Sequence, residues 1–146
     1  MKKFIFSLQS VLRLKENIEE NEKTVLYSLE AKKNALCREL SSLESQYRGT
    51  SQELKNLVCS GTSSLKISEY TYYIQDLDRK KAAKQREINE VQARIEKQTD
   101  LLLQIRTEIK SLEKLKENQH KVFTFARNKK NDIMIEDFVA GRRLMV

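Results

Sequence analysis

The sequence predicts an all-α protein: a long two-helix antiparallel coiled coil, or α-hairpin, with a short C-terminal amphipathic extension. Apolar residues recur every seven positions from Ile67 to Ala126, in two interleaved columns. The 146 residues include no Pro and only three Gly, so little in the chain breaks a helix. Small, turn-forming residues gather near mid-chain, at positions 59–64. We therefore expect a single coiled-coil domain over residues 1–146, with one turn between two helices.

The more regular of the two heptad patterns lies in the second half of the chain. Of the 18 positions in its two columns, 13 are apolar. A repeat of 3.5 residues per turn keeps one stripe against one partner and indicates a left-handed supercoil. We expect a helix over about 67–127, and roughly 60 helical residues run about 90 Å, which favours a rod over a compact globule. The columns are Ile67, Ile74, Lys81, Ile88, Ile95, Leu102, Ile109, Lys116 and Phe123, and Tyr70, Leu77, Lys84, Val91, Gln98, Ile105, Leu112, Gln119 and Ala126.

The first half of the chain has a less regular stripe and predicts a helix over about 7–58. A main column of heptad positions is accompanied by a second column. Each member of this companion column follows a member of the main column by three residues in the first part of the helix and by four residues in the later part. We therefore expect the stripe to shift around the helix near Lys32 and Lys33, which would change the supercoil locally. The main column is Leu8, Lys15, Glu22, Leu29, Leu36, Leu43, Thr50 and Leu57; the companions are Val11, Ile18 and Val25, then Leu40, Tyr47 and Leu54.

The predicted turn covers about residues 59–66. Gly61 can take a left-handed conformation, and Thr62, Ser63 or Ser64 can cap the next helix. A short turn between two heptad-bearing helices of similar length predicts an antiparallel hairpin.

The tail, residues 128–146, departs from the heptad pattern. Residues 128–132 form a polar interruption, and a short amphipathic segment follows, which Gly141 is expected to end. The apolar residues of this segment have no evident partner in the hairpin. They include Ile133, Ile135, Phe138 and Val139.

The net charge of +7 comes from 28 basic and 21 acidic residues. A basic balance favours nucleic acid, an anionic membrane or an acidic protein as partner, whereas interspersed acids and bases more simply solvate the outer faces of a coiled coil. Arg79 to Arg86 holds five bases at positions 79, 80, 81, 84 and 86, with no acid from 79 to 86. Since this run lacks interleaved aromatic residues, we expect no specific nucleic-acid binding.

Residues typical of catalysis are scarce. The chain has no Gly-rich phosphate loop, and its one His, His120, stands beside Gln119 on a helix flank. We therefore predict no enzyme activity, no metal site and no cofactor. Cys37 and Cys59 lie far apart and form no metal or disulfide motif, which is typical of reduced thiols. No apolar stretch has the length of a membrane span or of a signal-peptide core, so we expect a cytoplasmic protein without a transmembrane segment.

Three local patterns make the chain resemble the FliJ family, the small coiled-coil component of the bacterial flagellar type III export apparatus. Phe4 to Arg13 is similar to the family's Phe-x-Leu-x-x-Val-Leu opening. Past the turn, Tyr70, Tyr73, Ile74 and Leu77 match its Tyr-x-x-aromatic-aliphatic-x-x-Leu pattern. In the tail, residues 135–140 resemble its segment of an acidic pair between hydrophobic residues.

The resemblance implies a non-enzymatic stalk, shaped like the central stalk of rotary ATPases. It implies binding in the pore of the hexameric export ATPase FliI, contact with the export-gate protein FlhA, and association with export chaperones. It also implies peripheral association with the inner-membrane export apparatus. Lys80 and Lys84 depart from the family's small residue and His. The partner-binding residues carried over are Leu36, Leu40, Leu43 and Tyr47 of the first helix, Tyr73 and Leu77 of the second, and Ile135 and Phe138 of the tail.

Two alternatives stay open. The same features suit the equivalent stalk of a virulence type III secretion system. A basic coiled coil that binds nucleic acid is a candidate from a different class.

Overall fold

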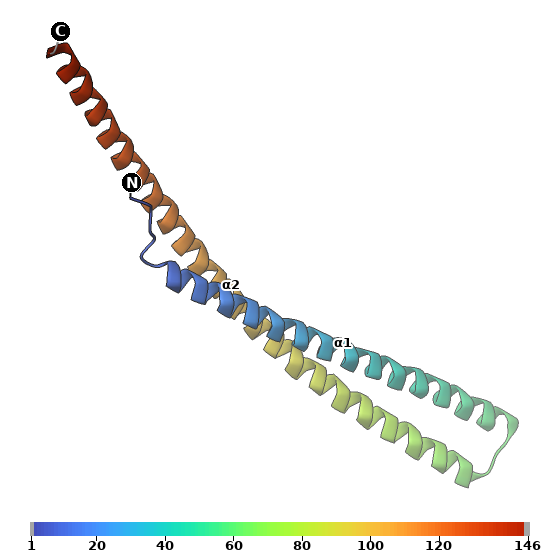
Figure 1. Ribbon diagram of the computed structural model, residues 1–146. Coiled ribbons are helices and arrows are strands. Elements are labelled where there is room, and N and C mark those ends of the chain that lie inside the picture. Colours follow the sequence, from blue (N-terminus) through green and yellow to red (C-terminus); the bar gives the residue numbers. More distant parts are fainter. Residues whose placement is uncertain (1, 145–146) are drawn as a thin grey trace. The chain divides into compact units, whose positions relative to one another are not determined.

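The computed structural model describes residues 2–144 and confirms the predicted α-hairpin. Two helices account for most of these residues: α1, Gln9–Ser60, with 52 residues, and α2, Ser64–Leu144, with 81. Figure 1 shows the two helices joined by one short connection, and no strand occurs within residues 2–144. The chain divides into two compact units, and each contains a stretch of both helices.

The turn between α1 and α2 uses the residue types that the sequence predicts. Gly61 has a φ of 82°, in the left-handed region that a side chain disfavours. Ser63 caps α2, because its Oγ accepts a hydrogen bond of 3.4 Å from the backbone N–H of Lys66. At the end of α1, the Ser60 hydroxyl donates to the Leu57 carbonyl at 3.2 Å. The turn is shorter than expected, because helix reaches Ser60 on one side and resumes at Ser64.

The first unit comprises residues 2–21 and 102–144 of the described chain. Its core pairs Phe6 and Leu12 with Ile105 and Ile109 of α2, and all four side chains are buried. Lys15 forms an ion pair with Glu108 at 2.6 Å beside this core. Half-buried apolar residues extend the core, namely Phe4, Leu8, Ile18 and Leu112.

The second unit comprises residues 22–101. Leu36 of α1 packs with Ile88 and Val91 of α2, and Leu40 and Ile95 pack against this cluster. Leu77, elsewhere in the same seam, is the most completely buried side chain, at 1% exposure. A single narrow seam between two helices therefore supplies the apolar core, as a heptad pattern requires.

Antiparallel register is visible in the contacts between α1 and α2. Lys33 donates to Gln92 at 2.6 Å, and Lys84 pairs with Glu39 at 2.6 Å. In each unit, the residue numbers of such partners add up to between 120 and 128. A turn centred near residue 62 predicts sums of roughly 120–124 for antiparallel partners, and the observed sums cover this range and reach slightly higher.

The predicted shift of the α1 stripe near Lys32 and Lys33 is wrong. Val11 and Val25, two of the three expected early companions, are exposed, whereas Leu12 is buried and Leu26 is half-buried. The third, Ile18, is half-buried and packs against the core of the first unit. The spacing of four places is therefore already present at Leu12 and Leu26, before Lys32. The physical reason is that both spacings offer apolar residues, and turning Leu12 inward buries a larger side chain than turning Val11 inward. The companions in the structure are Leu12, Glu19, Leu26, Lys33, Leu40, Tyr47 and Leu54.

The tail also differs from expectation, because α2 continues through the polar residues 128–132 and past Gly141 to Leu144. Asn, Lys and Asp lower helix propensity only modestly, and Gly costs about 1 kcal/mol in a helix interior. Neither is enough to stop a helix that is already propagating, and no Pro is present. The amphipathic extension is therefore part of α2 rather than a separate segment.

Leu77→Ala should lower the free energy of unfolding by about 2–4 kcal/mol, because it leaves a cavity in a fully packed part of the seam. Leu65→Ala is the matched control in the same helix and unit, since Leu65 is 70% exposed and should change stability by less than about 0.5 kcal/mol. Urea unfolding followed by circular dichroism measures both. Equal effects of the two substitutions would contradict the seam.

Candidate functional site

The predicted partner-binding residues of α1 lie on or next to the seam of the second unit. Leu36 is buried, whereas Leu40, Leu43 and Tyr47 are half-buried. A half-buried side chain at the edge of a two-helix seam packs against α2 and still offers part of its surface to a partner. The structure thus brings three of these four residues to positions that a bound protein can reach.

On α2, the two predicted residues of this region differ in burial. Leu77 points into the seam, at 1% exposure, while Tyr73 is 48% exposed. Leu77 therefore packs in the core below this surface, whereas the ring and hydroxyl of Tyr73 are partly exposed on the outside. Tyr is well suited to contacts between proteins because it combines a large apolar area with a polar tip.

A shallow hollow of about 460 Å³ lies between α1 and α2 beside Leu43. Its walls carry both signs of charge, which gives a partner fixed points for hydrogen bonding around an apolar patch. The lining residues are Glu39, Ser42, Leu43, Lys80, Ala83, Lys84 and Glu87.

Lys84 is the central charge of this hollow. Its Nζ lies 2.6 Å from a carboxylate oxygen of Glu39 on α1 and 3.8 Å from one of Glu87 on α2. The hydrogen bond with Glu39 is the main reason that the pKa of Lys84 is raised above its ordinary value of 10.5, against the opposing effect of burial. The ammonium is thus held in place between the two helices.

Tyr47 is fixed from the α2 side by a second cation. The Nζ of Lys81 lies 4.3 Å from the centroid of the Tyr47 ring, within the range of a cation–π interaction. Lys81 and Lys84 are polar members of the heptad columns, and each makes its contact across the seam. Sequence reasoning overlooked Glu39 as the partner of Lys84, although the antiparallel register was the signal that could have found it.

Tyr73 borders a second, smaller hollow of about 290 Å³ near the turn, together with Thr50, Glu53, Glu69 and Tyr70. The Tyr70 hydroxyl donates to a Glu53 carboxylate oxygen at 3.4 Å, which ties the start of α2 to α1. Tyr70 therefore serves the hairpin, and Tyr73 is left as the outward aromatic residue of this pair.

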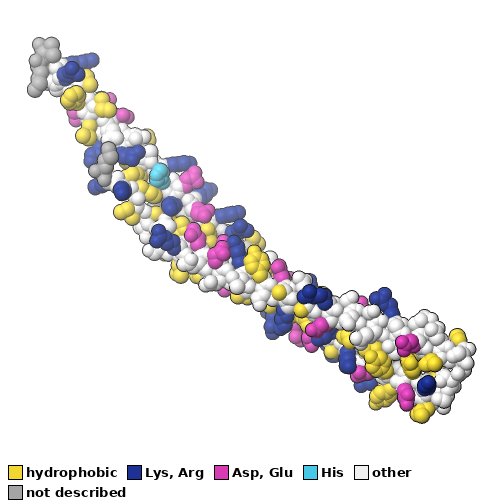
Figure 2. Space-filling model, turned by 45° about the vertical axis from the view of Figure 1, so that its right-hand side comes forward, with side chains coloured by type: hydrophobic (Ala, Val, Ile, Leu, Met, Phe, Trp, Pro, Cys, Tyr) yellow, Lys and Arg dark blue, Asp and Glu magenta, His cyan; other side chains and the backbone are white. Residues whose placement is uncertain are grey.

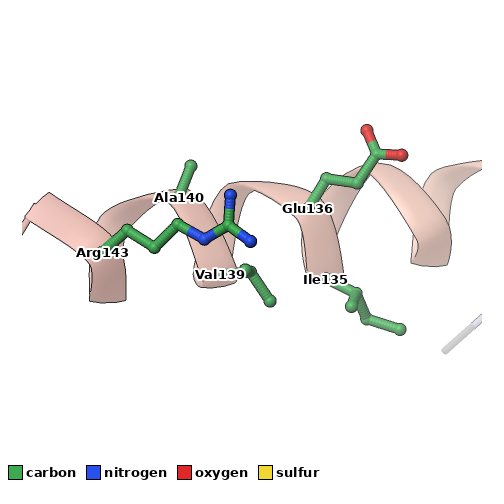
Figure 3. A pocket seen from close by; sticks show the side chains of 5 residues that line it. All are labelled: Ile135, Glu136, Val139, Ala140 and Arg143. Atoms are coloured by element: carbon green, nitrogen blue, oxygen red, sulfur yellow. The ribbon is translucent and has the colours of Figure 1, made fainter.

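Ile135 and Phe138 of the tail are exposed, at 61% and 70%. Figure 3 shows Ile135 and Val139 pointing to the same side of α2, with Glu136 directed away from them. Arg143 reaches along the helix at the other end of this shallow surface. These tail residues belong to the first unit, whereas the predicted site residues of α1 belong to the second.

Charges of both signs are interspersed over the visible face of the molecule in Figure 2. No group of three or more His, Cys, Asp or Glu residues in the described part of the chain is placed to hold a metal ion. His120 packs its ring edge-on against Phe4, with centroids 5.0 Å apart. Cys37 and Cys59 are unpaired and exposed.

A comparison with protein families matches residues 4–139 to the family described as Flagellar FliJ protein. The chain belongs to the FliJ family. The resemblance seen in the sequence is thereby confirmed over nearly the whole chain, and the protein is related to flagellar protein export. FliJ proteins form a non-catalytic family with structural and coupling roles. Comparisons with curated proteins and with solved structures find no match. Across the described residues, no helix of this FliJ-family chain is long and apolar enough to cross a membrane.

Glu39→Gln should reduce the pH dependence of stability in alkaline solution. Because the folded state raises the pKa of Lys84, the pair stabilises the fold below pH 10.5, and this stabilisation is lost as the pH rises through the higher folded-state pKa. The variant lacks the charged acceptor, so its melting temperature should fall less steeply than that of the unaltered chain above pH 10. Glu30→Gln, at an exposed position of α1, is the control with the same charge change. If the melting temperatures of all three proteins fell equally steeply above pH 10, the Lys84–Glu39 pair would not be the source of the alkaline pH dependence.

Proposed function

We propose that this FliJ-family chain is a non-enzymatic stalk that couples the hexameric export ATPase FliI to the export-gate protein FlhA. The observation that carries the proposal is the family match over residues 4–139, together with an antiparallel two-helix hairpin. A coiled coil of this kind has no enclosed site for chemistry, but it presents long outer faces whose side chains partners can grip. In this proposal the protein lies in the cytoplasm and associates with the inner-membrane export apparatus through its partners, among them export chaperones.

The gate would contact the second unit at the surface formed by Leu40, Leu43, Tyr47 and Tyr73. Support comes from their partial exposure, from the hollow with charged walls that Leu43 lines, and from the second hollow that Tyr73 borders. Leu36 and Leu77 would act from within the seam, since their packing sets the position of the exposed neighbours. Interfaces of this type depend on a few aromatic anchors, and Tyr73 is the outward candidate.

The ATPase pore would receive the first unit, with the N-terminal segment and the extension of α2. Ile135 and Phe138 are exposed there, and bases outnumber acids by six to three from Lys121 to Val146. Positive charge on a stalk would guide its entry into a ring with acidic loops and help to set its orientation, more than it would add affinity.

Tyr73→Ala should weaken binding to the cytoplasmic part of FlhA by roughly 1–3 kcal/mol, the range for loss of a buried interfacial aromatic. The melting temperature should hardly change, because Tyr73 stands outside the seam. Tyr27→Ala provides the control, since Tyr27 is an exposed tyrosine of α1 away from the proposed surface. Calorimetric titration with FlhA and FliI, beside thermal melting, gives both quantities. An early-melting Tyr73→Ala variant with normal FlhA binding would assign Tyr73 to the core instead.

Duplex DNA should bind weakly, without sequence preference, and binding should collapse between low and physiological salt. The reason is that dispersed surface bases act only through counterion release, and acids stand among them. Fluorescence anisotropy over a salt series measures this dependence. Tight binding that survives physiological salt would replace the stalk proposal with a nucleic-acid function.

A further inference from the structure

The seam face of α2 continues beyond the part that α1 covers. Given the register of the two helices, α2 residues after about 120 face the N-terminal segment, residues 2–8, instead of α1. Phe4 of this segment packs on His120 and on Phe123, with ring centroids 5.0 and 5.7 Å apart. Past Phe123, Ala126 is exposed although it occupies a heptad position.

At this point the first unit contains a pocket of about 530 Å³. Lys2 contributes from the N-terminal segment and the other lining residues come from α2. Their spacing of three or four residues places the α2 members on one face of the helix, in continuation of the seam. The lining consists of Lys2, Phe123, Ala126, Arg127, Lys130, Asn131 and Met134.

The lining combines apolar surface with charged side chains that are all positive. Phe123, Ala126 and Met134 supply the apolar part, and no carboxylate borders the pocket. Within the described residues, the structure gives no carboxylate partner to Lys2, Arg127 or Lys130. Lys15, Lys84 and Lys121, by contrast, all have such partners. Three cations without partners around an apolar surface are complementary to carboxylates that flank an apolar side chain.

We propose that this pocket binds an acidic peptide segment of a partner protein, in which an apolar side chain stands next to two or more carboxylates. The apolar side chain packs on Met134 and Ala126. The carboxylates accept hydrogen bonds from Arg127, Lys130 and Lys2, and the guanidinium of Arg127 can hold one of them with two donors. Asn131 offers an amide that pairs with the peptide backbone. Phe138 and Ile135 follow Met134 and Asn131 by four residues on the same helix face, but neither borders the pocket. The proposal holds whether or not the coupling function proposed above does.

A peptide suits this pocket better than the other anions. Nucleic acid binds along extended basic grooves with exposed aromatic rings for stacking, whereas Phe123 is half-buried under Phe4. A lipid surface requires apolar residues that project beyond the charges. In the lining, the apolar side chains share one helix face with the cations, and the volume of about 530 Å³ is that of a pocket for a few side chains.

The test uses the full chain and two fluorescent peptides of 12 residues. One alternates Glu and Asp with Leu and Phe, and the other carries Gln and Asn at the acidic positions. Anisotropy at physiological salt should show the acidic peptide binding at least about tenfold more tightly, the effect of one or two charge-assisted hydrogen bonds. Equal affinity for the two peptides would overturn the proposal.

Variants assign the binding to this pocket. The pair Arg127→Glu and Lys130→Glu should weaken the acidic peptide by about tenfold or more. The pair Lys110→Glu and Lys114→Glu makes the same charge change on α2 in the same unit, outside the pocket, and should weaken it about twofold at most. Met134→Asp should also abolish binding, because it places a carboxylate on the apolar surface. Circular dichroism melting checks that each variant folds.

The remaining outcomes identify a different occupant. Equal losses in the two charge-reversal pairs would show that binding follows diffuse surface charge and would reject the pocket. Vesicles of phosphatidylglycerol and phosphatidylcholine form the second arm. Binding of vesicles that depends on Arg127 and Lys130, without binding of the acidic peptide, would reject a peptide ligand in favour of a lipid headgroup.

Discussion

The apolar seam between α1 and α2 is the interaction on which the rest of the structure depends. A two-helix hairpin has no second layer, so each turn of helix contributes only one or two side chains to the core. Leu36, Ile88 and Val91 bury their surfaces against one another in one unit, and Phe6, Leu12, Ile105 and Ile109 do so in the other. Polar seam members such as Lys84 and Gln98 stay in place because each has a partner across the seam.

Because the core is limited to one seam, most side chains are exposed and available for binding. Tyr73 lies on α2 just outside the seam, whereas Phe138 and Met134 lie on the part of α2 that extends beyond α1. Register determines which cations meet acids. Lys84 lies opposite Glu39 on α1, whereas Arg127 and Lys130 lie past the start of α1 and meet none in the described chain. Ion pairs across the seam, such as that of Lys84 with Glu39, therefore form where α1 faces α2, and the bases that border the pocket lie on the part of α2 beyond α1.

The fold class, the turn and the α2 columns could be predicted because each rests on local residue types. Ile88, Val91 and Ile105 repeat with one spacing, and Gly61 with Ser63 marks the turn. The choice between Val11 and Leu12 could not be made from α1 alone, since both stripes are apolar and the packing against α2 decides. The end of α2 was missed because Gly141 weakens a helix without ending it.

The candidate site was predictable in part. Family resemblance pointed to Leu43, Tyr47 and Tyr73, and the structure places them at or near the surface of one unit. The heptad columns separated Leu77, which occupies a seam position, from Tyr73, which does not, and the structure agrees, with Leu77 buried and Tyr73 exposed. The basic pocket had no sequence signal, because Lys2 and Lys130 come together only through the packing of the N-terminal segment on α2.

The central claim, one antiparallel seam within a single chain, is tested most directly by an intramolecular distance. Spin labels go at Ser45 and Asp78, exposed residues of α1 and α2 in the same unit, with Cys37 and Cys59 replaced by Ser. Labelled chains are diluted with unlabelled ones. The hairpin predicts a distance under roughly 25 Å, since packed helix axes lie about 8–10 Å apart and the label arms add to this. A distance beyond about 40 Å, as extended helices with a rise of 1.5 Å per residue would give, would contradict it.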